Sequence, residues 1–131
     1  MRIALAFTIA GVGMALAATD PLQAHHSFAA TFDGNKPITL RGTISRMLWS
    51  NPHGHLYIDV KNQKGEVVTW EIETGSPAAL FRRGWRKDDL PVGKEVIVKG
   101  YLAKDGTPTA NASRVTLVET ARELFDGTQT P

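Results

Sequence analysis

The sequence predicts a mainly β domain, a five-stranded Greek-key barrel of the OB type with one short helix, after an N-terminal signal peptide. Two observations predict this class. Short segments alternate apolar and polar residues between turn signals, and one helical segment interrupts them. The order β-β-β-α-β-β is that of the OB barrel, in which the helix plugs one end between strands three and four. An open β-sandwich or half-barrel has the same order and is the alternative.

The first 24 residues have the organisation of an export signal. Arg2 supplies a positive charge, residues 3–18 form an uncharged and mostly apolar run, and Leu22-Gln23-Ala24 is a suitable cleavage tripeptide. The run is shorter than the roughly 20 apolar residues that cross a bilayer, so no membrane span is expected after cleavage. A rival cut after Ala17 or Ala18 stays open. The segment predicts a periplasmic or secreted protein.

Composition limits the classes of function. A chain of 131 residues is long enough to bury one core. The absence of cysteine excludes both disulfides and a thiolate metal site. The formal net charge of +2 is too small to indicate a nucleic-acid partner. We therefore expect one core that needs no cross-links.

The domain plan follows from the pattern of strands and turns. We expect an irregular lead-in over residues 25–37, the barrel over 38–119 and a tail over 120–131, within which 120–125 fit either a strand or a helical turn. In the first strand, alternate residues are expected to lie on one face of the sheet: Leu40, Gly42, Ile44, Arg46 and Leu48. Gly42 is expected to mark a bend or bulge. The predicted strands are 39–49, 55–60, 66–73, 95–102 and 111–118.

One short helix is predicted between the third and fourth strands. Ser76 can cap its N-terminus, Pro77 suits the first helical position, and residues 78–83 are mostly good helix formers. Gly84 fits the left-handed residue that ends such a helix. The helix is expected to pack Leu80 onto the barrel.

Four short motifs resemble those of a family of small exported bacterial proteins that share a domain of unknown function. The resemblance runs from His25 to about Leu117 and implies a β-rich, exported domain. It implies no established activity and no catalytic residue. The position of His55 is often not histidine in that family, so His53 is the stronger candidate for a shared functional residue. The motifs are His25-His26-Ser27-Phe28, Trp49-Ser50-Asn51-Pro52-His53, Gly75-Ser76-Pro77 and Arg83-Gly84-Trp85.

All four histidines lie in two tight pairs, and they are the candidate metal ligands: His25, His26, His53 and His55. Cleavage after Ala24 would give His25 a free amine beside its imidazole. An all-nitrogen set of this kind suits Cu(II), with zinc or nickel as alternatives. The set resembles, by ligand type alone, the histidine brace of exported copper sites. Strand alternation places His53 and His55 on one face if both are extended.

A purely structural interpretation of the same residues stays open. His53 would then be a turn residue whose imidazole bonds a backbone carbonyl, and His55 a surface residue. Phe28 and Phe32 would pack into the core, and their docking would also bring the new terminus towards His53. On the His55 face, Asp59 is a candidate to orient an imidazole.

Other polar groups give weaker signals. A basic cluster around Trp85 would suit an anionic partner or, more simply, complement a helix C-terminus. Glu71 and Glu73 share an outward strand face without a partner motif. The cluster consists of Arg82, Arg83, Arg86 and Lys87.

We therefore expect a small exported binding domain, without an organic cofactor, that holds copper through its paired histidines. The chain contains no nucleophile elbow, phosphate loop or zinc-protease motif, which favours a non-enzymatic role. A metal-free module that binds a ligand or a periplasmic protein is the alternative, and a small copper oxidoreductase is the third. No nucleic-acid partner is expected.

Overall fold

The computed structural model describes residues 28–125, so the predicted signal peptide and the histidines His25 and His26 lie outside the described residues. A helical turn over residues 28–31 opens this part of the chain. The elements that follow are β1 (Phe32–Leu48), β2 (His55–Lys61), β3 (Val67–Glu73), α2 (Pro77–Arg82), the 3-10 turn η1 (Lys87–Asp89), β4 (Glu95–Ala103), β5 (Thr109–Leu117) and β6 (Arg122–Phe125).

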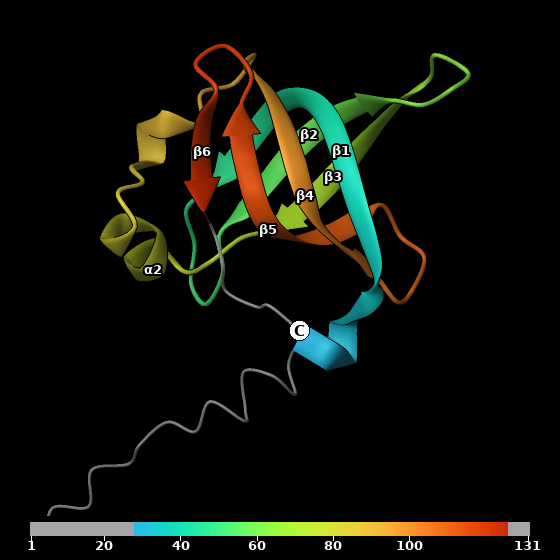
Figure 1. The fold of residues 1–131 in the computed structure, drawn as a ribbon, viewed down its shortest axis with the longest axis horizontal. Coiled ribbons are helices and arrows are strands. Elements are labelled where there is room, and N and C mark those ends of the chain that lie inside the picture. The colour runs from blue at the N-terminus through green and yellow to red at the C-terminus, as the bar shows by residue number, and fades with distance from the viewer. Residues whose placement is uncertain (1–27, 126–131) are drawn as a thin grey trace, which may run out of the picture.

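The strands form one mainly antiparallel sheet that closes into a barrel-like ring (Figure 1). Neighbouring strands follow the order β3-β2-β1-β4-β5-β6, and β3 also pairs with β5. This closing pair is parallel and joins Glu71, Ile72 and Glu73 to residues 109–111. The outer face of the β2–β3–β5 region is thereby one continuous surface.

The inner face of the ring is apolar because each strand alternates buried and outward side chains. Burying one Val, Leu or Ile side chain contributes about 1.5–3 kcal/mol, which lets a chain without disulfides hold its fold. The inner face is built from Leu40, Ile44, Leu56, Ile58, Ile72, Val96, Val98, Ala110, Ala112 and Val115.

The short helix forms where the sequence predicts it. The Ser76 side chain accepts a hydrogen bond of 3.2 Å from the backbone N–H of Ala79, and Pro77 occupies the first turn. Gly84 follows the helix with a φ of 88°, which a glycine adopts without strain. Leu80 is fully buried, so the helix covers one end of the ring beside Trp85.

We expect Ser76→Ala to lower the free energy of unfolding by about 1 kcal/mol, because the Ala79 N–H loses its capping acceptor. Chemical denaturation of the folded protein measures the loss. Ser76→Asp, which keeps a capping oxygen, is the matched control and should retain most of the stability. Equal losses in both variants would contradict the capping role.

Two of the predicted boundaries are wrong. β1 begins at Phe32, inside the segment expected to be irregular, and Phe32 itself is 2% exposed. Its pairing with Ala103 on β4 holds this early part of the strand in the sheet. Residues 122–125 of the expected tail form β6 along β5, which settles the choice between strand and helical turn. The sheet therefore has six strands where five were expected.

The prediction that alternate residues lie on one face along the whole of β1 is also wrong. The register with β2 shifts between Ile44 and Arg46, which marks a bulge. Beyond it Met47 packs against the core, while Leu48 is 38% exposed. Gly42 lies before the bulge, and a Cβ there would meet the Asp59 carbonyl oxygen at 2.6 Å. Gly42 therefore permits close approach of two strands and does not form the bulge.

Candidate functional site

The turn that carries His53 is bound to the end of β3 by backbone and side-chain hydrogen bonds. The Gly54 N–H donates to the Gly75 carbonyl at 3.0 Å, and the Thr74 N–H donates to the Gly54 carbonyl at 2.8 Å. The Ser50 hydroxyl donates to the His53 carbonyl at 2.9 Å. These bonds fix the backbone on both sides of the His53 side chain.

Gly54, between the two histidines, is required by close packing. A Cβ at this position would lie 2.6 Å from the Thr74 Oγ1 and 3.3 Å from the Met47 side chain. Thr74 is fully buried, so its hydroxyl has no room to withdraw. The spacing of His53 and His55 therefore depends on a glycine between them.

His53 makes the backbone contact that the structural interpretation predicts. Its Nδ1 lies 3.2 Å from the Thr74 carbonyl oxygen and 3.7 Å from Oε1 of Glu73. A carbonyl oxygen only accepts hydrogen bonds, so Nδ1 carries the proton. In the neutral ring the lone pair is then on Nε2, the form in which an imidazole binds a metal.

His55 lies against the second glutamate of β3. Its Nδ1 is 2.9 Å from Oε1 of Glu71, and the two side chains are 29% and 40% exposed. His55 Nδ1 is buried and, despite this short distance, makes no hydrogen bond to any described residue. Nδ1 of His55 therefore faces Glu71 on β3.

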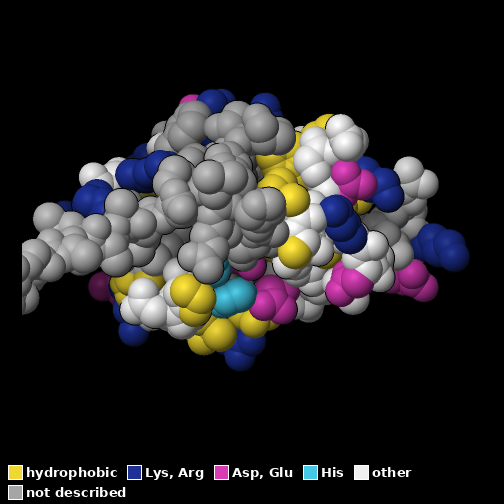
Figure 2. Space-filling model, turned by 90° about the horizontal axis from the view of Figure 1, so that it is seen from below, with side chains coloured by type: hydrophobic (Ala, Val, Ile, Leu, Met, Phe, Trp, Pro, Cys, Tyr) yellow, Lys and Arg dark blue, Asp and Glu magenta, His cyan; other side chains and the backbone are white. Residues whose placement is uncertain are grey.

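These side chains share the outer face of the ring. His55 pairs with Glu73 across β2 and β3, and Glu71 lies two residues along the same strand, on the same side. We call His53, His55, Glu71, Glu73 and Asn111 the histidine face. Figure 2 shows histidine side chains at the surface, next to acidic and hydrophobic ones.

Asn111 is the buried member of the histidine face. It pairs with Glu73 across the parallel strands, and its Nδ2 donates to Oε1 of Glu73 at 3.4 Å. The residue is 2% exposed, and its Oδ1 has no hydrogen-bond partner in the described part of the chain. A buried acceptor without a partner costs about 1–3 kcal/mol.

Sequence reasoning missed the role of the two glutamates. Glu71 and Glu73 were expected outward, as observed, but without a partner. Strand pairing around the turn of residues 62–65 places them beside the histidines, and that pairing was a usable signal. Asp59, expected to orient an imidazole, instead accepts a hydrogen bond of 2.7 Å from Thr69.

The described residues supply two imidazoles to the face. Within residues 28–125, no group of three or more His, Asp or Glu side chains is arranged to hold a metal ion. The other two predicted ligands, His25 and His26, lie outside the described residues.

Arg86, one of the four residues of the basic cluster, has a structural role. Trp85, at the centre of the cluster, is 1% exposed, so its indole is not a surface platform. The Arg86 guanidinium stacks 3.9 Å from the centre of the Phe81 ring and donates to the carbonyls of Phe81 and Trp85. Arg86 therefore fixes the chain that follows α2.

In the described chain, no helix is long and apolar enough to span a membrane.

Comparison with known sequences gives a family without an assigned activity. A search of curated proteins found no match. The sequence profile of the Family of unknown function (DUF6152) matches residues 13–112, which is most of the chain and includes both histidine pairs. The protein therefore belongs to this family of unknown function.

Proposed function

We propose that the protein is an exported, non-enzymatic binding domain that holds a late transition metal on the histidine face. Copper is the first choice, with zinc and nickel as alternatives. The observation that carries the proposal is that Nδ1 of His53 lies 3.2 Å from the Thr74 carbonyl oxygen, and Nδ1 of His55 lies 2.9 Å from Oε1 of Glu71. This arrangement leaves both Nε2 atoms for a metal and resembles the outer-shell support of known metal-binding histidines.

The further nitrogen ligands would come from His25, freed by cleavage after Ala24, or from His26. Phe28 packs edge-on against Tyr101, with ring centres 5.7 Å apart. Tyr101 pairs with Asn111, which in turn pairs with Glu73.

Two strand spacings, about 10 Å, therefore separate Tyr101, on which Phe28 packs, from Glu73. Three residues of chain reach about 10 Å, which is comparable to the span from Tyr101 to Glu73, the neighbour of His53.

We also propose that the ring is an OB-type barrel. The support is the strand order, with β1 paired to both β2 and β4, the parallel closing pair β3–β5, and α2 between β3 and β4. In such barrels the helix plugs one end. This assignment concerns the scaffold and by itself implies no function.

The alternative function is a metal-free interaction module. The observation that favours it is the hydrogen bond from His53 to the Thr74 carbonyl, which is a sufficient structural reason for an imidazole at this turn. A module of this kind would bind a periplasmic protein or a small ligand equally well with or without metal, and it would tolerate any side chain that keeps the bond.

Calorimetric titration of the exported protein with Cu(II) and Zn(II) tests the proposal. Mass spectrometry first establishes that the chain starts at His25. We expect one metal ion to bind at micromolar concentration or below. The matched control keeps Ala24 at the terminus, which removes the amine of His25 as a ligand and should weaken Cu(II) binding. The absence of Cu(II) and Zn(II) binding by the chain that starts at His25 would refute the metal function.

We expect Glu71→Gln to weaken Cu(II) binding by about 10- to 100-fold, the usual effect of losing an outer-shell carboxylate. The amide still fills the space beside His55 but no longer places a negative charge next to Nδ1 of the metal-binding ring. Glu66→Gln, in the exposed β2–β3 turn, is the control and should bind as the wild type does. Equal affinities in all three proteins would contradict the role given to Glu71.

A further inference from the structure

The ring holds a second feature at the end away from α2, where a cavity of about 380 Å³ opens between β3 and the β4–β5 turn. Its apolar lining includes Val68 and Trp70 of β3 and Leu102 of β4. Trp70 pairs with the fully buried Ile58, so its indole belongs to the inner face of the ring. The cavity is therefore the open mouth of the core.

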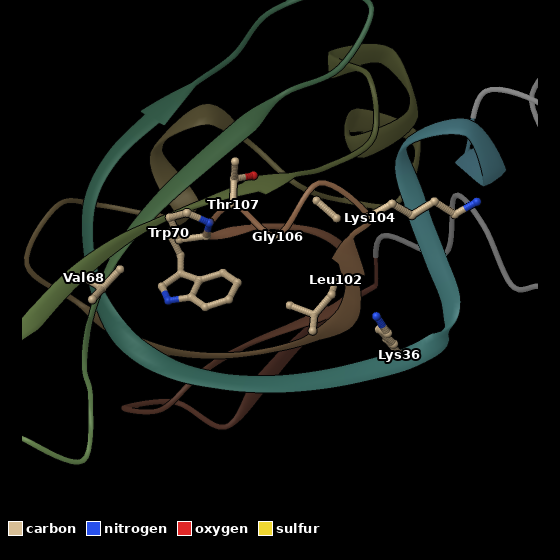
Figure 3. Close-up of a pocket in the computed structure, with 9 residues that line it drawn as sticks. Lys36, Val68, Trp70, Leu102, Lys104, Gly106 and Thr107 are labelled. Carbon is tan, nitrogen blue, oxygen red and sulfur yellow. The ribbon is translucent and has the colours of Figure 1, made fainter.

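The aromatic ring of Trp70 forms the main wall of this cavity. Figure 3 shows its indole and the Leu102 side chain facing one another, with Val68 beside the indole. The indole is half-buried, although it packs against the core. A half-buried indole opposite an aliphatic wall is suited to hold a flat aromatic group by stacking.

The rim of the cavity is positively charged. Lys36 and Lys104 both line it, and none of the described lining residues is acidic. The Lys104 ammonium donates to the Ala29 carbonyl and points away from Trp70 and Leu102 (Figure 3), which leaves Lys36 as the cation that can meet a ligand. Lys36 lies 3.9 Å from Asp33, and its side chain is 65% exposed, so it can turn towards a ligand.

We propose that the mouth of the ring binds a small aromatic monoanion, such as an arene carboxylate. The ring of the ligand stacks on Trp70 between Val68 and Leu102, and its carboxylate meets the ammonium of Lys36. The volume is at the lower end of the range of about 300–1,000 Å³ for small-molecule sites, which occur in the mouths of β-barrels. The site shares no residue with the histidine face and does not depend on a metal.

Titration with 2-naphthoate tests this site, observed through the indole N–H resonance of Trp70 in the full protein. We expect saturable binding of 2-naphthoate and weaker binding of the neutral 2-naphthamide, because only the acid carries the charge that Lys36 meets. Metal-free protein should behave identically, which separates this proposal from the metal function. Equal binding of acid and amide, or no shift of the Trp70 resonance, would overturn the proposal.

Two variants locate the ligand. Trp70→Leu should weaken 2-naphthoate binding by at least about fivefold, the lower end of the effect of losing a stacking aromatic. Lys36→Gln should weaken it by about two- to fivefold, as expected for one exposed ion pair. Lys64→Gln, in the exposed β2–β3 turn, is the charge-matched control and should bind as the wild type does. Equal loss in both lysine variants would contradict the role of Lys36.

Discussion

In the chain that starts at His25, replacement of His53 by asparagine should lower the Cu(II) affinity by more than about 100-fold, since loss of outer-shell partners alone costs 10- to 100-fold. The asparagine amide retains a donor near the position of Nδ1 and can still bond the Thr74 carbonyl. It has no equivalent of Nε2. The variant therefore separates the metal ligand from the turn residue, and calorimetric titration measures the difference.

The control for this experiment is the thermal stability of the metal-free variants. The thermal unfolding midpoint of metal-free His53→Asn should stay close to that of the metal-free wild type, whereas His53→Ala should unfold earlier because the Thr74 carbonyl loses its donor. Unchanged copper affinity in His53→Asn would support the metal-free interaction module. A large loss of stability in His53→Asn would mean that the amide does not replace the imidazole.

Gly54→Ala should lower the free energy of unfolding by about 1–3 kcal/mol, the usual cost of an extra group in a packed site. The added methyl would lie 2.6 Å from the Thr74 Oγ1, so the His53 turn must move away from β3. Because that movement also shifts His53, Cu(II) affinity should fall with stability. Chemical denaturation and calorimetric titration of one preparation measure both effects.

A second substitution tests the cause of this loss. Thr74→Ala removes the hydroxyl that meets the new methyl, so the double variant should recover part of the stability lost in Gly54→Ala. Strictly additive losses would show that the clash with Thr74 is not the cause. The Thr74→Ala single variant is the required reference, since its hydroxyl also bonds the Gly75 carbonyl.

The interior of the fold could be predicted because alternation is a strong signal in long strands. Inward positions such as Ile58, Trp70 and Ile72 lie in runs with a clear period of two, and the structure confirms them. The helix was equally clear, since Ser76 and Gly84 each have a specific role at one of its ends.

The edges of the fold could not be predicted in the same way. β6 has four residues, too few for alternation to be distinguished from chance, and its pairing with β5 is a tertiary contact. The early part of β1 contains Gly34 and Pro37, which indicate a loop, yet Phe32 is buried and pairs with Ala103. Tertiary packing determines the structure at both ends.

The candidate site, too, could be predicted from the sequence only in part. The sequence alone predicted that His53 and His55 would share a face, and both contact the same face of β3. Their glutamate partners come from the neighbouring strand of the same hairpin, so they depend on the register set by the turn of residues 62–65. Asn111 comes from a third strand through the parallel pairing with β3. No local motif specifies that pairing.

The electron paramagnetic resonance spectrum of the exported protein with one equivalent of Cu(II) tests the central claim most directly. Our account predicts an axial spectrum with nitrogen couplings from the terminal amine and the imidazoles, and loss of one imidazole coupling in His53→Asn. A spectrum of free copper, or one that is identical in the wild type and His53→Asn, would contradict the claim that the histidine face holds the metal.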